Sequence, residues 1–331
     1  MHIFKGTNYD FLRWRWHAIA LSWIIILLGI VTIATRGLKK GVEFAGGTVV
    51  IEQFEQPVSI QQVRTALEKS FGQDLSIQEF GDPSQRQVMI RVPQVGAEAG
   101  ASLGATADAI EAALKQATIG AFKRQGTEIV GPAVGRELTT KGIWATVLSL
   151  AGILAYISFR FQLSFAAGAV VATIHDLLIT FAFLAFFGYD LTLNVIAALL
   201  AITGFSTNDT IVIFDRVREN LRGMRRDSLD RVINVAINQT LGRTVITSGT
   251  ALLSALALFF FGGDVLHGFA FTMVVGIITG TYSSVFIAAA IVSFWRGSTT
   301  RAAAHAPAST SAPAPQQPQR KQKPQKKARA S

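Results

Sequence analysis

Six long apolar runs constrain the fold of this chain more than any other feature. They lie at roughly 17–35, 142–159, 163–187, 191–214, 243–261 and 268–295. A helix of about 20 apolar residues crosses the hydrocarbon core of a bilayer and satisfies its own backbone hydrogen bonds there. Of the 331 residues, 50% are hydrophobic and 16% are charged, which is unusual for a soluble protein. The sequence therefore predicts a polytopic α-helical membrane protein with six transmembrane helices.

The first run has some features of a signal peptide, because Arg13 and Arg15 precede its apolar body. However, Thr35-Arg36 stands where a small-residue cleavage site would follow. We therefore expect an uncleaved anchor rather than a processed leader.

The distribution of Lys and Arg near the span ends predicts the orientation. Basic residues precede the first run and occupy the second and fourth connections, whereas 188–190 and 262–267 contain none. We expect the N-terminus 1–16, the loop 215–242 and the tail after the last run to be cytoplasmic. The segment 36–141 then lies outside the cytoplasm.

The pattern within 36–141 predicts a small α+β domain. Its expected strands and helices follow the order β-α-β-β-α-β of a ferredoxin-like fold. They lie at 42–54, 60–69, 75–80, 87–92, 105–121 and 127–130, with a Gly-Gly interruption in the first strand.

The tail 296–331 is rich in Ala, Pro, Gln and Lys and has no apolar periodicity, so we expect it to be disordered. Its Lys and Arg residues favour contact with anionic lipid. A ribosome or nucleic-acid contact is the alternative, but the tail has no interleaved aromatic residues to stack on bases. We expect no nucleic-acid partner.

Asp209 lies inside the fourth run, between Asn208 and Thr210. An ionisable residue among membrane-facing aliphatic residues costs roughly 2.5–3.5 kcal/mol on insertion scales, and such residues usually face a bundle interior or a water-filled path. This placement favours a role in proton or ion handling.

Arg243 begins the fifth run, which also carries Thr247. Because a single loop joins the fourth and fifth runs, Arg243 and Asp209 come to a similar depth, and we expect an ion pair or a proton-linked switch between them. The alternative for Arg243 is an anchor at the membrane surface.

Two further polar clusters have a structural and a functional interpretation. His175 and Asp176 lie deep in the third run, where Asp176 is either part of an ion path or a structural group satisfied by its neighbours. Asp215 and Arg216 follow the fourth run, and we interpret them as an exposed helix end.

The chain lacks the signatures of an enzyme or of a nucleotide-driven engine. It contains no phosphate-binding loop of the G-x-x-x-x-G-K-[ST] type, no H-E-x-x-H motif that would bind a metal, and no cysteine. We therefore expect a non-enzymatic protein without cofactors or metal. Energy would come from a partner or from an ion gradient, with protons as the coupling ion.

Several motifs together resemble a known family. Gly41-Val-Glu-Phe-Ala-Gly-Gly47 opens the extracytoplasmic domain, Glu128-Ile-Val-Gly-Pro-Ala-Val-Gly-Arg-Glu-Leu138 leads into the second run, and Asn208-Asp-Thr-Ile-Val-Ile-Phe-Asp-Arg-Val-Arg-Glu-Asn220 leaves the fourth. With Arg243-Thr-Val-Ile-Thr-Ser-Gly-Thr250, they are similar to the SecF family, whose members are subunits of the SecDF accessory complex of the bacterial Sec protein-export translocase. The motif positions include Glu43, Gly46, Gly47, Gly131, Pro132, Asp215 and Arg216.

The resemblance implies a resistance-nodulation-division type of transporter fold in the bacterial inner membrane. It implies SecD as the partner half, with SecYEG, SecA, YajC and exporting preproteins as further partners. It also places Asp209 and Arg243 in a proton path that drives late-stage preprotein translocation by the proton motive force. Glu43 stands where the family usually has Asp, which keeps the charge and adds one methylene.

Two alternative functions stay open at this point. The first is a proton-coupled small-molecule or lipid exporter of the resistance-nodulation-division type, which would be expected to carry bulkier extracytoplasmic modules. The second is a purely structural assembly factor, for which neutralising Asp209 would leave activity intact.

Overall fold

The computed structural model describes residues 7–72, 75–81, 83–93, 103–161 and 163–295. The expected N-terminal segment 1–16 is therefore described from Thr7 onward. The predicted disordered tail 296–331 lies outside the described residues.

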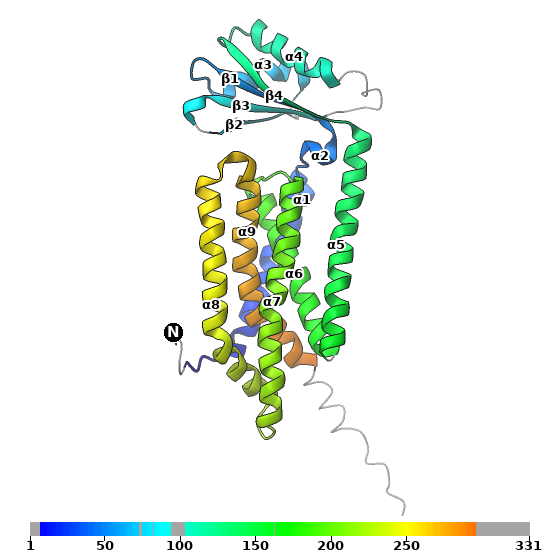
Figure 1. Ribbon diagram of the computed structural model, residues 1–331, viewed down its shortest axis with the longest axis vertical. Coiled ribbons are helices and arrows are strands. Elements are labelled where there is room, and N and C mark those ends of the chain that lie inside the picture. Colours follow the sequence, from blue (N-terminus) through cyan, green and yellow to red (C-terminus); the bar gives the residue numbers. More distant parts are fainter. Residues whose placement is uncertain (1–6, 73–74, 82, 94–102, 162, 296–331) are drawn as a thin grey trace, which may run out of the picture.

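Six helices are long and apolar enough to cross a membrane, and they form a bundle with a small sheet domain at one end (Figure 1). The prediction of a polytopic α-helical membrane protein is confirmed. The helices are α1 (Arg15–Arg36), α5 (Pro132–Arg160), α6 (Leu163–Phe187), α7 (Leu193–Gly223), α8 (Leu229–Phe261) and α9 (Gly263–Ser283). A π-helical turn (Ser284–Ala288) continues α9, and the helical path then runs on to residue 295.

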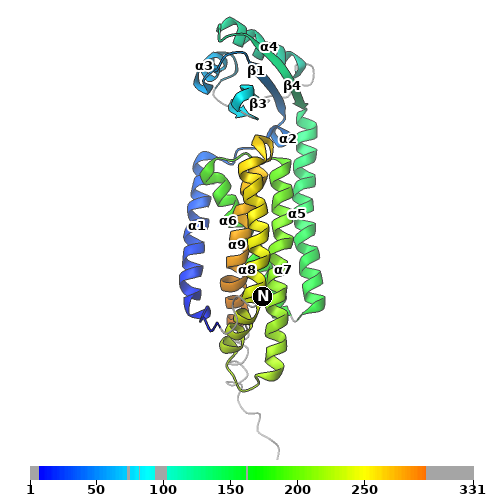
Figure 2. The ribbon, with the colours of Figure 1, turned by 60° about the vertical axis from the view of Figure 1, so that its left-hand side comes forward.

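Helix α9 is the most enclosed of the six. Of its most apolar stretch 67% is buried, against 17% for α8 and 6% for α5. It packs against α6, α7 and α8, while α1 packs mainly on α6. Helix α5 stands at the edge of the bundle, as both ribbon views show (Figure 2). The faces of α5 and α8 are therefore available to lipid or to a partner.

Close helix packing in the bundle depends on small residues. A Cβ on Gly276 of α9 would lie 2.1 Å from Ile202 Cδ1 of α7, and one on Gly280 would lie 2.9 Å from Ser206 Cβ. These two glycines form a G-x-x-x-G pattern, which lets helix backbones approach closely. The approach brings the polar side chains of α7 and α9 within hydrogen-bond distance.

The predicted cytoplasmic loop 215–242 is mostly helical, so this expectation was wrong. Helix α7 continues to Gly223 and α8 begins at Leu229, which leaves only 224–228 as a connection. The hydropathy signal stops where the helices leave the apolar layer, but Val217 and Val232 still pack in the core. The side chain of Ser228 also accepts a hydrogen bond from the Arg231 backbone N–H and caps α8.

Helix α5 likewise begins ten residues earlier than the apolar run at 142–159. Gly131 is its N-cap and Pro132 its first residue, a position that suits proline because its missing N–H has no partner within the helix. The first turns of α5 contain polar residues, so hydropathy alone does not indicate where the helix begins.

The sheet domain has the predicted ferredoxin-like fold. Four strands form an entirely antiparallel sheet in the order β2-β3-β1-β4, and helices α3 and α4 connect them as the β-α-β-β-α-β order requires. The elements are β1 (Gly47–Phe54), α3 (Ile60–Phe71), β2 (Ser76–Phe80), β3 (Gln87–Pro93), α4 (Leu103–Gln116) and β4 (Phe122–Val130). Both helices cover the sheet face that points away from the bundle (Figure 1).

The core of this domain follows the alternation of the strands. Val50 and Ile90 are register partners on the helix-covered face, and both are fully buried against Val63 and Leu67 of α3 and Ile110 of α4. Ser59 and Gln62 form a capping box that fixes the start of α3.

Two local predictions in the domain were wrong. The expected strand 42–54 begins only at Gly47, because Gly46 has a φ of 76° and a short helix α2 (Val42–Ala45) precedes it. The helix expected over 105–121 ends at Gln116, where Thr118 and Gly120 take positive φ values and turn the chain into β4. That strand consequently begins at Phe122 rather than at residue 127.

The domain is fixed to the bundle at two places. Arg91 of β3 pairs with Asp190, in the turn between α6 and α7, at 2.5 Å. The chain after α1 is bound to the same turn, since Gly41 N–H donates to Leu191 O and Leu191 N–H donates to Lys39 O, both at 2.8 Å.

Candidate functional site

Asp176 lies at the centre of a buried hydrogen-bond network between α6, α7 and α9. Its side chain is 2% exposed, and its Oδ2 accepts from Ser206 Oγ at 2.5 Å and from Ser283 Oγ at 2.8 Å. Its Oδ1 lies 2.9 Å from Nδ1 of His175. Each carboxylate oxygen therefore has a partner from the protein, as the structural interpretation of Asp176 requires.

His175 is bound on one side only. Its Nδ1 faces Asp176, whereas its Nε2 is buried and has no hydrogen-bond partner among the described residues. The ring lies 6.4 Å, centroid to centroid, from that of Tyr282. His175 thus orients the carboxylate and keeps one nitrogen unused.

Asp209 lies on the same helix as Ser206, but its environment is different. It is 5% exposed, and its Oδ1 accepts from Thr244 Oγ1 of α8 at 3.1 Å. Its Oδ2 is buried without a hydrogen-bond partner in the described part of the chain. Of the two buried aspartates of the bundle, Asp209 is therefore the one that retains an unused acceptor, and it can take a proton or a donor from outside this set of residues.

The two neighbours of Asp209 in the chain face different surroundings. Thr210 is buried, and its hydroxyl lies 2.9 Å from that of Ser284 in the π-helical turn. Asn208 is exposed, because consecutive residues of a helix are turned by about 100°. Of the polar trio 208–210, only Asp209 and Thr210 belong to the buried site.

The structure does not contain the expected ion pair between Asp209 and Arg243. Arg243 is exposed on α8 and forms none of the ion pairs found among the described residues. Thr244, one residue further, faces α7 instead, while Thr247 is exposed and donates to the backbone oxygen of Arg243. The predicted depth was right, because the next residue, Thr244, reaches Asp209, but the rotation of α8 leaves Arg243 on the exposed face.

Asp215 and Arg216 lie beyond this site, at the end of the bundle opposite the sheet domain. Asp215 is exposed and lies 3.6 Å from Arg160, while Arg216 contacts Glu219 and Gln239. Because α7 runs on to Gly223, Asp215 and Arg216 lie within the helix rather than at its end, and the interpretation of an exposed helix end was wrong in this respect.

Sequence reasoning missed the hydroxyl donors of both carboxylates. Ser206, Ser283 and Thr244 are ordinary helix residues until the packing places them next to Asp176 and Asp209. The G-x-x-x-G pattern at 276–280 was a usable signal, because it brings α9 and its serines against α7.

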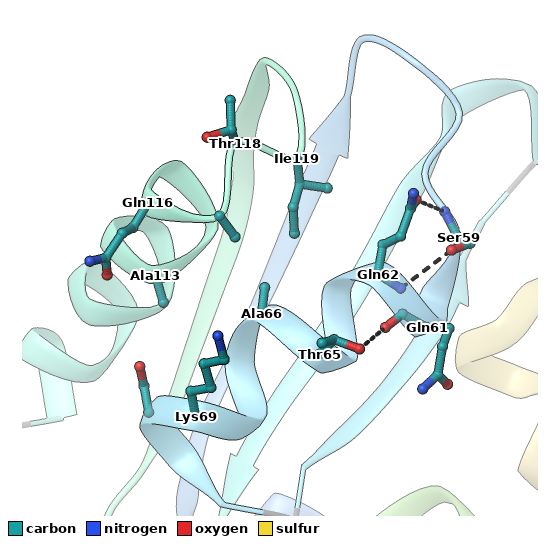
Figure 3. Close-up of a pocket in the computed structure, with 12 residues that line it drawn as sticks. Ser59, Gln61, Gln62, Thr65, Ala66, Lys69, Ala113, Gln116, Thr118 and Ile119 are labelled. Atoms are coloured by element: carbon teal, nitrogen blue, oxygen red, sulfur yellow. Dashed lines mark hydrogen bonds between the residues drawn. The ribbon is translucent and has the colours of Figure 1, made fainter.

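A groove on the far side of the sheet domain was also not predicted. It has a volume of about 790 Å³ and lies between α3 and the end of α4 (Figure 3). Its lining is mostly neutral and polar, including Gln61, Gln62 and Gln116, with Lys69 as its one charged residue.

Comparison with known proteins identifies the family. The family model described as "Protein export membrane protein SecD/SecF, C-terminal" matches residues 109–298, and the "SecD/SecF GG Motif" matches residues 31–58. Protein translocase subunit SecF of Vibrio alginolyticus is 43% identical over 282 residues, which cover 85% of this chain and 88% of the relative. That of Desulfurispirillum indicum is 41% identical over 293 residues, covering 86% and 91%. This chain belongs to the SecF family of protein translocase subunits.

Solved structures of SecDF show the same architecture. The crystal structure of SecDF, a translocon-associated membrane protein from Thermus thermophilus, matches with a TM-score of 0.76 at 32% sequence identity. The match covers 88% of this chain and 39% of the SecDF chain. A second structure, SecDF in its super-membrane-facing form, matches with a TM-score of 0.67.

The structure gives a physical reason for the glycine pair of the SecD/SecF GG motif. Gly47 has a φ of 146°, and a Cβ on it would lie 2.4 Å from the Val92 backbone oxygen. Gly46, at a φ of 76°, turns the chain from α2 into β1. The pair therefore lets the first strand of the SecF domain start directly at the membrane-facing end.

Glu43, Gly131 and Pro132 lie at the same junction. Glu43 is in α2, and burial raises the pKa of its carboxyl. Helix α2 packs on the start of α5, where a Cβ on Gly135 would lie 2.8 Å from the Phe44 backbone oxygen. These motif residues lie at the junction between the sheet domain and α5.

Proposed function

We propose that this chain is one half of a proton-driven export complex in the bacterial cytoplasmic membrane, with a SecD protein as the other half. The pair uses the proton motive force to promote late-stage translocation of preproteins through the SecYEG channel, in concert with SecA and YajC. The chain is not an enzyme, it needs no cofactor besides protons, and both of its termini are cytoplasmic. Its sheet domain then lies outside the cytoplasm.

The observation that carries this proposal is that Oδ2 of Asp209 has no hydrogen-bond partner in the described part of the chain. A buried carboxylate oxygen without a donor is costly, so the group gains from a proton or from an approaching cation. Arg243 lies one residue from Thr244, the present partner of Asp209, but on the outer face of α8. A rotation of α8 that exchanged Thr244 for Arg243 would supply the missing partner.

This exchange provides a coupling cycle. When Arg243 is turned away, the carboxyl of Asp209 holds a proton, and when Arg243 turns in, the ion pair forms and the proton leaves. A membrane potential supplies about 2.3 kcal/mol per proton per 100 mV for this motion. Only 17% of the most apolar stretch of α8 is buried within this chain, so its outer face can meet the partner half.

The same burial pattern supports a second protein chain beside this one. Helix α5 buries only 6% of its most apolar stretch, and the structural match of this chain covers 39% of the SecDF chain in the Thermus structure. A SecD half would account for the remainder of that architecture and would contribute the acidic or water-lined side of the proton path.

The test is secretion of a signal-peptide reporter in cells depleted of their own SecF. These cells would carry this chain with its matching SecD, as wild type, as Asp209→Asn or as Asp215→Asn. We expect the wild type and Asp215→Asn to restore secretion, because Asp215 is exposed outside the buried site. Asp209→Asn should leave secretion near the level of the depleted cells, at least tenfold below wild type.

Membrane insertion of each variant is measured in parallel. Equal rescue by Asp209→Asn and wild type would keep the export role and remove the proton mechanism. If stably inserted wild type failed to restore secretion, the exporter alternative would replace the export subunit. Proton uptake into liposomes that contain the SecD-paired complex should fall with Asp209→Asn and should be unchanged with Asp215→Asn.

A further inference from the structure

A charged cleft separates the sheet domain from the domain-side end of the helix bundle. Its volume is about 930 Å³. Strands β2 and β3 line it from the domain, and the ends of α1, α6 and α9 line it from the bundle. The order of these elements along the long axis of the molecule can be followed in both ribbon views (Figures 1 and 2). Asp209 is not among the residues that line it.

The side chains that line the cleft carry an excess of positive charge. Five are cations and two are acids, and His267 is also present; the cations are Arg36, Lys39, Lys40, Arg64 and Arg91, and the acids are Glu79 and Asp190. Arg91 and Asp190 neutralise each other in their ion pair, where both side chains are less than one fifth exposed. The four other cations therefore share the cleft with a single carboxylate, that of Glu79.

Three of these cations have no partner for their charge among the residues that the structure describes. Within the described ranges, no acid lies at ion-pair distance from Arg36, Lys39 or Lys40, and all three are exposed. Like charges that share a cleft raise its positive potential and attract an anion. The positive charge of the lining therefore favours a ligand with at least one negative group.

Backbone hydrogen bonds fix the position of the segment that carries Lys39 and Lys40. The hydrogen bonds of Lys39 O and Gly41 N–H to Leu191 fasten this segment to the turn between α6 and α7 on either side of Lys40. A Cβ built on Gly188 of that turn would lie 3.9 Å from Lys39 Nζ, so the ammonium group lies above the turn. The lysines belong to a fixed surface of the cleft rather than to a free loop.

The depth of the cleft identifies the kind of anion. Arg36 is the last residue of α1, Phe187 the last of α6, and Thr192 the N-cap of α7. These positions coincide with the limits of the apolar runs 17–35, 163–187 and 191–214, and the limits of such runs lie at the level of lipid headgroups. Phe187 lines the cleft, and Leu28 and Val31 lie further along α1 from Arg36; all three are more than half exposed and offer an apolar surface for acyl chains.

We propose that this cleft binds the phosphate of an anionic lipid headgroup, from the leaflet on the side of the sheet domain. The phosphate sits among Arg36, Lys39 and Lys40, and the acyl chains follow the exposed face of α1. A lipid bound there bridges the sheet domain and the bundle at the place where the Arg91–Asp190 pair already joins them.

The test uses the full chain, purified in a neutral detergent, and native mass spectrometry of its lipid adducts. Phosphatidylglycerol is the probe, phosphatidylethanolamine is the zwitterionic comparison, and glycerol phosphate is the soluble one. We expect one saturable phosphatidylglycerol adduct. Lys39→Gln/Lys40→Gln should weaken it about 30-fold, the change that corresponds to about 1 kcal/mol for each of two cations near the surface.

A matched control separates this site from general charge effects. Lys69→Gln/Lys123→Gln removes the same charge from two exposed lysines elsewhere on the domain and should leave the affinity within about twofold. Lys39→Arg/Lys40→Arg keeps the charge and should retain binding, which shows that loss in the glutamine variant is not misfolding.

Four results would overturn the proposal. Two of them concern the variants: the affinity for phosphatidylglycerol is unchanged in Lys39→Gln/Lys40→Gln, or it falls equally in Lys69→Gln/Lys123→Gln. Equal affinity for glycerol phosphate would make the cleft a soluble-phosphate site. Displacement of phosphatidylglycerol by an acidic peptide but not by a second anionic lipid would make it a polypeptide site.

Discussion

Glu52 in the sheet domain is a buried carboxyl whose effect on stability can be measured directly. It lies on the helix-covered face of β1, is fully buried, and has no hydrogen-bond partner for either oxygen in the described structure. Burial, reinforced by the nearby carboxylate of Glu111, raises the pKa of Glu52 from its usual 4.5 to about 7. The cations Arg124 and Lys115 oppose this shift but do not cancel it.

The direction of the pH effect follows from proton counting. In the unfolded chain, Glu52 loses its proton near pH 4.5, so between pH 4.5 and about 7 the folded state holds one proton more. The contribution of Glu52 is therefore most favourable below pH 4.5, declines as the pH rises to about 7, and stays at its lowest level above that. A shift of about 2.5 pH units corresponds to about 3 kcal/mol of lost stability.

Glu52→Gln removes the ionisable group and keeps the shape of the side chain. At pH 8 the variant domain should be more stable than wild type by up to about 3 kcal/mol, and at pH 4.5 the two should be nearly equal. Hydrogen–deuterium exchange of β1 and α4 in the full chain measures this, because a comparison at one pH cancels the intrinsic exchange rate. Amides that exchange by unfolding of the domain should be protected about a hundredfold more in the variant at pH 8.

Glu55→Gln is the matched control. It makes the same chemical change three residues along the chain, on an exposed side chain, and should leave exchange unchanged at both pH values. Equal exchange of Glu52→Gln and wild type at pH 8 would refute the argument, since it would mean that Glu52 stays protonated there or that water reaches it. Faster exchange in the variant at both pH values would show that Glu52 has a partner that glutamine cannot replace.

Two further predictions concern packing and the junction between domain and bundle. Gly29→Ala should destabilise the protein by about 1–3 kcal/mol, because the new Cβ would lie 2.2 Å from Ala182 Cβ and 2.8 Å from its Cα. Thermal unfolding in detergent measures the loss. The control is Gly152→Ala, whose Cβ meets no atom within 4 Å. A double-mutant cycle with Arg91→Ala and Asp190→Ala should give a coupling of about 1–3 kcal/mol in protection of β3 against hydrogen exchange, because the pair is largely shielded from water. Additive losses would mean that the two side chains do not join the domain to the bundle.

The sequence could predict the six spans because hydropathy depends only on local composition. The same signal misplaced the ends of α7 and α8, since the helices continue in water for as long as residues such as Val217 and Val232 pack in the core. In the sheet domain, strand alternation predicted the fold. The positive φ values at Gly46 and Gly120 shifted the element boundaries by several residues.

The candidate site was predictable in part. Composition alone identified Asp209 as a group that must be buried or hydrated, and the structure places it at 5% exposed. The partner of Asp209 could not be predicted, because a turn of about 100° per residue separates Thr244 from Arg243 and the rotation of α8 depends on its packing. The same holds for Ser206 and Ser283, whose contact with Asp176 depends on the close approach of α7 and α9.

The two buried carboxylates, Asp176 and Asp209, differ in how readily their protonation and their partners can change. Donors from α6, α7 and α9 surround Asp176, and α9 is the most enclosed of the six spans, so any change at Asp176 must move packed helices. Asp209 depends instead on one hydroxyl from α8, which buries only 17% of its most apolar stretch. A rotation of α8 against α7 and α9, on which it packs, would replace one partner of Asp209 by another. A proton-coupled motion is therefore expected at Asp209 and α8, while Asp176 keeps the helices behind them in register.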